Sequence, residues 1–335
     1  MRELEDESVE LMVTSPPYPM IEMWDTVFSL QKPGIKEALD KKNGQTSFEL
    51  MHRELDNVWG EVYRILKKGG FACINIGDST RKIGNDFELY PNHSRILQKC
   101  LDLGFSVLPE ILWRKQTNAP NKFLGSGMLP ASAYVTLEHE FILILRKGGK
   151  REFKTSEEKR KRMQSAFFWE ERNLWFSDVW EDLKGAKQNE LTPEIRARSG
   201  AYPFELPYRI INMFSLRGDT VLDPFLGTGT TMAAAMATGR NSIGIEIDLN
   251  FKKHFKQRFK NTKEFSNDVV DNRIRNHLKF AQGREKDMKP LKHINKTYGF
   301  PVVTRQEVEI IFDKLEKIAI EGNLIKVQYE NSYAQ

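Results

Sequence analysis

A rigid loop that carries hydrogen-bond acceptors follows the first apolar run of the chain. Residues 9–13 (Val-Glu-Leu-Met-Val) predict a short buried strand, and Ser15, Pro16, Pro17 and Tyr18 follow it. The prolines fix φ and remove backbone donors, so neither a helix nor a central strand continues through this loop. The Ser15 hydroxyl and the Pro16 carbonyl can both accept hydrogen bonds from one amino group, and Tyr18 offers a ring for stacking. The loop could therefore hold and activate an aromatic amine, since its acceptors are positioned beforehand.

A second run, near residue 225, has the composition of a ligand-binding turn. Residues 220–223 predict a buried strand that ends in Asp223, and 232–237 predict a helix of small residues. Between them lie two glycines, which let the backbone approach a ligand closely, and two threonines, whose hydroxyls can cap helix N–H groups or meet a carboxylate. The next predicted strand, 241–246, ends in Glu246, where dinucleotide sites place the acid that binds ribose hydroxyls.

Two common nucleotide sites do not fit this turn. A nicotinamide site requires Gly-x-Gly-x-x-Gly and a P-loop requires Gly-Lys-Ser/Thr, whereas this run reads Asp-Pro-Phe-Leu-Gly-Thr-Gly-Thr-Thr. Together with Ser-Pro-Pro-Tyr, it resembles the motifs of the DNA amino-methyltransferases, which move a methyl group from S-adenosylmethionine to cytosine N4 or adenine N6. The resemblance implies S-adenosyl-L-methionine as the cofactor and the four loop residues as catalytic. It implies these cofactor-binding residues: Asp223, Pro224, Phe225, Gly227, Gly229, Thr230, Thr231, Glu246, Asp248, Pro203 and Phe204.

The order of the two motifs implies a permuted sheet. The catalytic loop precedes the cofactor turn, which resembles the β group of these enzymes, whose sheet is circularly permuted relative to other methyltransferases. Members of this group usually have a further strand and a Gly-Asp pair ahead of the catalytic strand, at the adenine pocket. We expect either that the true start lies upstream or that another element closes this pocket. The resemblance divides the chain into a catalytic half (1–147), a target-recognition region (148–200), a cofactor-binding half (201–263) and a helical C-terminal extension (264–335).

Alternating helical and strand patterns support an α/β fold, with a Rossmann-like methyltransferase sheet and helices on both faces. Apolar residues at helical spacing predict helices, and short apolar runs predict strands, of lengths that suit a parallel or mixed sheet. The expected helices are 48–68, 91–103, 208–215, 269–280 and 304–320. The further expected strands are 71–76, 106–113 and 139–145. A Gly-Gly pair after 48–68 has the composition of a helix C-cap.

The segment 148–200 suits contact with DNA, because it is basic and contains Phe-Phe-Trp and Trp-Phe runs. Positive side chains neutralise phosphates and give salt-sensitive affinity. For any single lysine an exposed helix face explains the charge as well, and such aromatics are more often core than base-stacking groups. The expected DNA-binding residues are Lys150, Arg151, Lys159, Arg160, Lys161 and Arg162. A glycine-containing run, 118–129, is expected to form a loop that closes on DNA.

Composition and length limit the class of protein. The chain has 335 residues, of which 40% are hydrophobic, enough for a large α/β domain and a smaller module. Its net charge of +5, from 51 basic and 46 acidic residues, indicates little by itself. No apolar stretch approaches the roughly 20 residues that span a bilayer. The charged N-terminus lacks the apolar core of a signal peptide, so we expect a cytoplasmic protein with no membrane partner.

Cysteine and histidine usage argues against two chemistries. Methylation at carbon 5 of cytosine needs a thiolate, typically in a Pro-Cys loop, but neither Cys73 nor Cys100 follows a proline. Both are expected to be inert core thiols. Neither these cysteines nor the six histidines have the spacing of metal ligands, so no metal is expected.

The serine at position 15 indicates which base we expect to be methylated. Adenine-N6 enzymes of the resembled family usually carry Asp-Pro-Pro-Tyr, whereas Ser-Pro-Pro-Tyr is typical of N4-cytosine enzymes. We therefore expect a site-specific enzyme that flips cytosine out of double-stranded DNA and methylates N4, within a restriction–modification system. N6-adenine methylation is the alternative, and a catalytically silent subunit that binds nucleic acid is the alternative of another class. A homodimer and a cognate restriction endonuclease are the expected protein partners.

Overall fold

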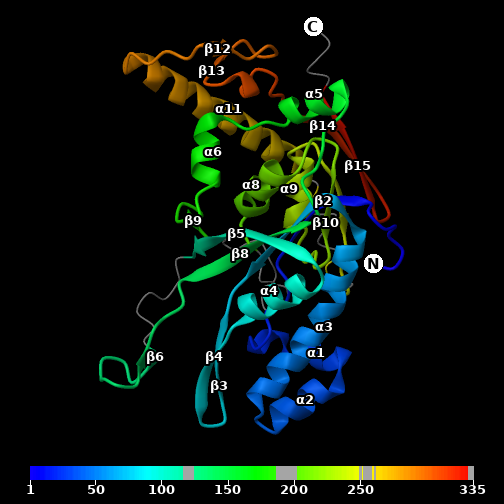
Figure 1. Ribbon diagram of the computed structural model, residues 1–335, viewed down its shortest axis with the longest axis vertical. Helices are drawn as coiled ribbons and strands as arrows, with labels where there is room; N and C mark the ends of the chain where they lie inside the picture. The colour runs from blue at the N-terminus through cyan, green and yellow to red at the C-terminus, as the bar shows by residue number, and fades with distance from the viewer. Residues whose placement is uncertain (116–123, 186–201, 249–250, 252–258, 260–261, 331–335) are drawn as a thin grey trace.

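The centre of the fold is a mixed β-sheet of seven strands, in the order β11-β10-β1-β2-β8-β5-β9 (Figure 1). A computed structural model of the chain describes residues 1–115, 124–185, 202–248, 251, 259 and 262–330. Neighbours from β11 to β2 are parallel, whereas β8 is antiparallel to both β2 and β5. The strands are β11 (Asn241–Gly244), β10 (Thr220–Asp223), β1 (Val9–Thr14), β2 (Leu66–Ile76), β8 (His139–Lys147), β5 (Phe105–Arg114) and β9 (Val179–Trp180).

Parallel pairing of β1 with β10 and β2 brings the two sequence motifs together. Met12 of β1 lies opposite Leu222 of β10, and Val13 lies opposite Cys73 of β2. These three strands therefore end on one side of the sheet, here named the carboxyl edge, and begin on the other, the amino edge. The catalytic loop follows β1 and the cofactor turn follows β10. Both lie at the carboxyl edge, where open α/β sheets bind their ligands.

Helices cover both faces of the sheet, because the side chains of β1 alternate between two cores. Met12 packs with the helices on one face, and Leu11 and Val13 pack with those on the other. All three side chains are fully buried. The predicted α/β sheet with helices on both faces is confirmed. The helices are α3 (Gly44–Ile65) and α4 (Asn92–Asp102) on the first face, and α8 (Glu205–Phe214) and α9 (Thr230–Met236) on the second.

Short elements project beyond the carboxyl edge, in the lower half of Figure 1. They include two small helices near the N-terminus and two β-hairpins. Residues 118–123 of the predicted loop 118–129 lie outside the described residues, and its remainder belongs to the second hairpin. The elements are η1 (Glu22–Trp24), α1 (Asp25–Gln31), α2 (Pro33–Asp40), β3 (Ser79–Ile83) with β4 (Asp86–Tyr90), and β6 (Leu124–Gly125) with β7 (Ala133–Tyr134).

Strand β2 begins earlier than the sequence predicts. The helix expected at 48–68 ends at Ile65, and the Gly-Gly pair interpreted as its cap lies inside β2. Gly69 has a φ of +80°, and a Cβ on Gly70 would lie 2.8 Å from the carbonyl oxygen of Glu10. The pair accommodates a shift of register between β1 and β2, as glycines do at β-bulges. The two glycines thus allow β1 and β2 to approach closely, and they do not end a helix.

The insert that follows β8 joins the sheet directly. Its described part contains α5 (Ser156–Gln164), α6 (Trp169–Trp175) and β9, which pairs in parallel with β5. The fully buried Trp113 of β5 donates its Nε1 hydrogen to the carbonyl oxygen of Leu183 at 3.0 Å. The insert is therefore held to the catalytic half by a strand pair and by this indole hydrogen bond.

The C-terminal extension is only partly helical. The helix predicted at 269–280 lies within α11, but the helix predicted at 304–320 is wrong. Gly322, with a φ of +64°, and the following asparagine form a two-residue hairpin turn, and Ile318 and Ile320 alternate towards a core below α9. Among the described residues, no helix combines the length and apolar character needed to cross a membrane. The elements are α11 (Thr262–Lys286), β12 (His293–Ile294), β13 (Pro301–Val302), η2 (Arg305–Glu307), β14 (Leu315–Glu321) and β15 (Leu324–Tyr329).

Trp113→Ala should lower the free energy of unfolding by about 3–5 kcal/mol, the usual cost of emptying a buried tryptophan site. The neighbouring Leu112, which is 36% exposed, is the matched control, and Leu112→Ala should cost about 1 kcal/mol or less. Urea denaturation followed by circular dichroism measures both values. Equal losses in the two variants would contradict the packing of the insert on β5.

Candidate active site

The loop of Ser15, Pro16, Pro17 and Tyr18 emerges from β1 at the carboxyl edge. Pro16 is buried, whereas the other three residues are partly exposed. A Cβ on Gly77, at the end of β2, would lie 3.0 Å from the Tyr18 ring. Glycine at this position therefore leaves the space that the tyrosine ring occupies.

Polar contacts from neighbouring elements hold the far end of this loop. Ser79 Oγ donates to the Pro19 carbonyl at 2.8 Å, and Asn92 Nδ2 donates to the same oxygen at 3.2 Å. Arg81 of β3 forms a two-fold ion pair with Asp25 at 2.7 and 2.8 Å. The loop is thus fixed by the sheet, by α4 and by the first hairpin, as preorganised acceptors require.

A chain of hydrogen bonds runs from Ser15 through Tyr18 to Glu140. Ser15 Oγ donates to Tyr18 Oη at 3.2 Å, and Tyr18 Oη donates to Glu140 Oε2 at 2.9 Å. Burial, together with the nearby Glu140 carboxylate, raises the pKa of the Tyr18 phenol well above its ordinary value, so this group keeps its proton. The Ser15 proton is therefore directed towards Tyr18. The lone pairs of the serine oxygen remain available as acceptors for another group.

Three residues that sequence analysis missed complete this chain. Asn75 Nδ2 donates to Tyr18 Oη at 2.9 Å and to Glu140 Oε2 at 2.7 Å. Lys115 Nζ lies 2.8 Å from Glu140 Oε1 and compensates the charge of this largely buried carboxylate. The sequence signals are weak: Asn75 is a polar residue in an apolar strand, and the two charged residues flank other strands. Their meeting depends on pairing between distant strands.

The cofactor turn has the tight backbone that its glycines predict. Gly227 and Gly229 have φ values of +50° and +78°. Glu246 closes the turn: its Oε2 accepts from the Gly227 amide and its Oε1 from the Asp248 amide, both at 2.8 Å. The carboxylate is partly exposed, and each oxygen keeps a second lone pair for a ligand hydroxyl.

Asp223 links the catalytic loop to the cofactor turn. Its Oδ1 accepts from Thr14 Oγ1 at 2.6 Å, and its Oδ2 accepts from Thr231 Oγ1 at 2.6 Å. The Phe225 amide also donates to Oδ1, at 3.1 Å. Burial raises the pKa of Asp223 to about 6, although the two threonine hydrogen bonds oppose this shift. Sequence analysis identified Asp223 and Thr231 but not Thr14, the residue that joins the two motifs.

The remaining cofactor residues predicted from the resemblance surround this turn. Pro224 and Thr230 are buried within it. The hydroxyl of Tyr202 forms a hydrogen bond with Thr231, which brings the start of the 202–204 stretch to the helix that follows the turn. Phe204 stacks on Tyr208 with ring centroids 5.5 Å apart. Pro203 and Phe204 are both partly exposed.

The predicted DNA-binding residues lie away from this site. Arg151 pairs at 2.6 Å with Asp219, which directly precedes β10, and Lys161 lies 3.8 Å from the same carboxylate. A Cβ on Gly69, near the start of β2, would lie 2.6 Å from the Arg151 amide. These contacts put this basic group at the amino edge, whereas the catalytic loop lies at the carboxyl edge. Lys150 and Arg162 lie close by in the same segment, and Lys159 and Arg160 are exposed on α5.

Two hairpins project from the carboxyl edge, β3–β4 after β2 and β6–β7 between β5 and β8 (Figure 1). Phe87 of the first stacks on Tyr134 of the second, with ring centroids 4.9 Å apart. The tip of the second hairpin is apolar and exposed: Met128 is 86% and Leu129 69% accessible. Its strands connect β5 to β8, close to the residues that carry the Lys115–Glu140 pair. The hairpin is therefore connected to the active site through β8, and its tip projects away from the sheet (Figure 1).

This chain is similar in sequence to known proteins. A family model described as DNA methylase matches residues 9–257, a range that contains both motifs. The chain belongs to the DNA methylase family. It is 56% identical to the type II methyltransferase M.MthZI of Methanothermobacter thermautotrophicus, over 92% of this chain and 86% of that protein. It is 53% identical to the type II methyltransferase M.MjaI of Methanocaldococcus jannaschii, over 75% of this chain and 85% of that protein.

A solved structure is also similar to this methylase. A Thermus thermophilus protein described as a putative DNA modification methylase, solved with S-adenosyl-L-methionine, is 31% identical with a TM-score of 0.60. The match covers 78% of this chain and 89% of that one. S-adenosyl-L-methionine is the cofactor of this methylase. The turn suits this cofactor, because the partly exposed Glu246 carboxylate can accept from ribose hydroxyls, and among the described residues a Cβ on Gly227 would meet only the Phe225 carbonyl, at 3.9 Å.

The free energy of unfolding of the protein should depend on pH because Asp223 is buried. With a pKa of about 6 in the folded protein against 3.8 ordinarily, the carboxyl binds its proton more tightly when folded. Its favourable contribution is therefore complete below about pH 4 and is lost as the pH rises through about 6. Asp223→Asn removes this titration, so the stability of the variant relative to the parent should increase by about 3 kcal/mol between pH 4 and 8. Urea denaturation of both proteins without cofactor measures this, and a difference independent of pH would contradict it.

Proposed function

We propose that this methylase transfers a methyl group to N4 of a cytosine that has been flipped out of double-stranded DNA. The observation that carries the proposal is the direction of the hydrogen bonds at the catalytic loop. Ser15 gives its proton to Tyr18 at 3.2 Å and so offers its oxygen to the amino group of a base. The carbonyl of Pro16 is the second proposed acceptor.

The hydrogen-bond acceptors of the catalytic loop can raise the low reactivity of an aromatic amine. The amino nitrogen of cytosine shares its lone pair with the ring, and two hydrogen bonds from this group to Ser15 and Pro16 would draw the lone pair back to nitrogen. S-adenosyl-L-methionine supplies the methyl group from a positively charged sulfur. Once the N–C bond has formed, the nitrogen is positive and must lose a proton. Ser15 can accept it while passing its own to Tyr18, which passes its own to the Glu140 carboxylate.

The assignment to cytosine depends on Ser15. In the resembled enzymes a serine at this position is typical of N4-cytosine methylation, and an aspartate of N6-adenine methylation. We also propose that the protein modifies its own recognition site in a restriction–modification system, because the relatives M.MthZI and M.MjaI are both named type II methyltransferases.

Labelling of DNA tests this proposal directly. The protein would be incubated with tritiated S-adenosylmethionine and unmethylated duplex DNA, and the digested nucleosides would be separated. Label in N4-methylcytosine supports the proposal. Label in N6-methyladenine would overturn the choice of base, and bound cofactor without label in any nucleoside would favour a catalytically silent subunit.

Ser15→Ala should lower kcat by about a hundredfold or more, the usual effect of removing one preorganised polar group from a reacting centre. The dissociation constant for S-adenosylmethionine should change less than about twofold, because Ser15 contacts the Tyr18 hydroxyl and not the cofactor turn. Single-turnover kinetics and calorimetry measure the two quantities. The matched control is Ser8→Ala, whose hydroxyl bonds the Glu5 carbonyl at the far end of β1. A parallel loss of cofactor affinity would mean that Ser15 is structural.

The exposed tip of the second hairpin should contact the DNA substrate. Apolar side chains inserted between base steps help other proteins to unstack DNA, and Met128 and Leu129 are exposed at the tip of a hairpin inserted between β5 and β8, the strands that bring the Lys115–Glu140 pair together. The double variant Met128→Ser, Leu129→Ser should raise the KM for duplex DNA about tenfold, or about 1.4 kcal/mol. Met288→Ser is the control, since this side chain is 89% exposed just beyond α11. An unchanged KM in the double variant would exclude the tip from the substrate site.

A further inference from the structure

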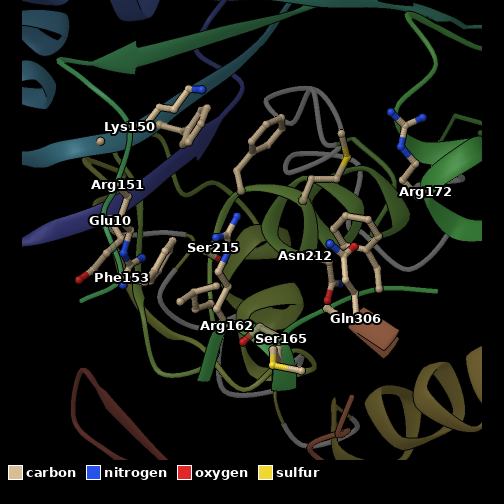
Figure 2. A pocket seen from close by; sticks show the side chains of 18 of the residues that line it. Glu10, Lys150, Arg151, Phe153, Arg162, Ser165, Arg172, Asn212, Ser215 and Gln306 are labelled. Carbon is tan, nitrogen blue, oxygen red and sulfur yellow. The ribbon is translucent and has the colours of Figure 1, made fainter. Parts of the chain in front are cut away.

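A large cavity lies at the amino edge of the described chain, away from the catalytic loop. It has a volume of about 1230 Å³ and is lined by the starts of β1 and β2, the segment 150–176, the end of α8 and the region around η2. Figure 2 shows Lys150 and Arg151 on one side of this amino-edge pocket and Arg172 on the opposite side. Glu10 lines the pocket and Ser15 begins the catalytic loop, five positions apart on or after β1, which corresponds to about 17 Å. A base bound at Ser15 therefore does not occupy this pocket.

Positive charge dominates the lining of the amino-edge pocket. Two of its cations are compensated, since Lys67 pairs with Glu10 and Arg151 with Asp219. The other acid of the lining, Glu307, accepts hydrogen bonds from the backbone amides of the 169 and 304 positions. The remaining cations form no ion pair with any residue that the structure describes. They are Lys68, Arg146, Lys150, Arg162 and Arg172.

Exposed aromatic rings alternate with these cations. The Arg162 guanidinium lies 4.7 Å from the centre of the Phe153 ring, and that of Arg172 lies 5.6 Å from the Phe176 ring. Trp169 and Phe176 are 41% and 39% exposed, although both line a cavity in which apolar rings would ordinarily be covered. Planar rings beside uncompensated cations are the arrangement with which proteins bind single-stranded nucleic acid, whose bases stack while its phosphates are neutralised.

We propose that the amino-edge pocket is a second nucleic-acid site, which takes a short stretch of single-stranded DNA. Its cations contact the phosphates, and Trp169 and Phe176 stack on the bases. Duplex DNA fits the pocket less well, because its bases are already stacked and offer no faces to these rings. This inference goes beyond the proposed methyl transfer and does not depend on which base is methylated.

Binding of an oligonucleotide tests this site separately from catalysis. Fluorescence anisotropy of labelled dT₁₂ would be measured with the full chain, and short duplex DNA of unrelated sequence would be the competitor. Lys150→Glu, Arg162→Glu should weaken dT₁₂ binding at least tenfold and reduce the salt dependence by about 1.4 in log–log slope, as loss of two phosphate contacts predicts. Lys159→Glu, Arg160→Glu is the matched control: it makes the same charge change in the same segment, outside the lining, and should change affinity less than about threefold.

A second measurement reports the stacking itself. Bound dT₁₂ should quench tryptophan fluorescence, and Trp169→Leu should abolish most of the quenching, because a base covers this ring in the complex. Thermal unfolding would show that each variant remains folded. Equal weakening by the two charge variants would reveal a diffuse basic surface and overturn the proposal. Equally strong competition by duplex DNA, or quenching that persists in Trp169→Leu, would overturn it too.

Discussion

The active site depends on one hydrogen bond, from Thr14 Oγ1 to Asp223 Oδ1 at 2.6 Å, between residues 209 positions apart. It exists because β1 and β10 are parallel neighbours, so that the residues ending them meet at one edge. Thr231 donates to the other oxygen of the same carboxylate. The catalytic loop and the cofactor turn therefore share a single rigid anchor. Their relative position is set by strand register, which permits much less variation than two flexible loops would.

The two buried carboxylates of this site have opposite environments. Asp223 has hydroxyl and amide donors but no cation among the contacts at its oxygens, and burial raises its pKa to about 6. Glu140 is paired with Lys115 at 2.8 Å and receives a hydrogen bond from Asn75. An ionised Asp223 therefore reduces the stability of the protein without cofactor at neutral pH, a cost that functional sites commonly retain. Glu140 has its charge compensated and suits the end of a proton path.

The features that could be predicted from sequence are those that depend on residues close together in the chain. Strand β10 was predicted at its observed bounds, because apolar runs act over a few positions, and Glu246, which sequence analysis selected, lies two residues beyond β11 and contacts the glycine turn. Asn75, Lys115 and Glu140 were missed, since their meeting needs the antiparallel pairing of β8 with β2 and β5. Apolar residues at 308, 311, 312 and 315 fit a helix by spacing, yet they lie in the turn after η2, a loop and the start of β14. The Gly-Asn pair at 322–323 was the overlooked signal of that hairpin.

The basic segment after β8 shows that composition does not determine where a charged segment packs. Its charges suit contact with phosphate, but charge carries no information about which edge of a sheet it will reach. That choice is made by Asp219, a buried residue that pairs with Arg151. Asp219 precedes β10 and Asp223 ends it, so one short strand carries the anchors of both regions, about 13 Å apart. Because a strand in the middle of a sheet scarcely changes length, the two surfaces are held at a fixed separation. Charge at the amino edge is therefore kept apart from the hydrogen bonds of Asp223 at the carboxyl edge.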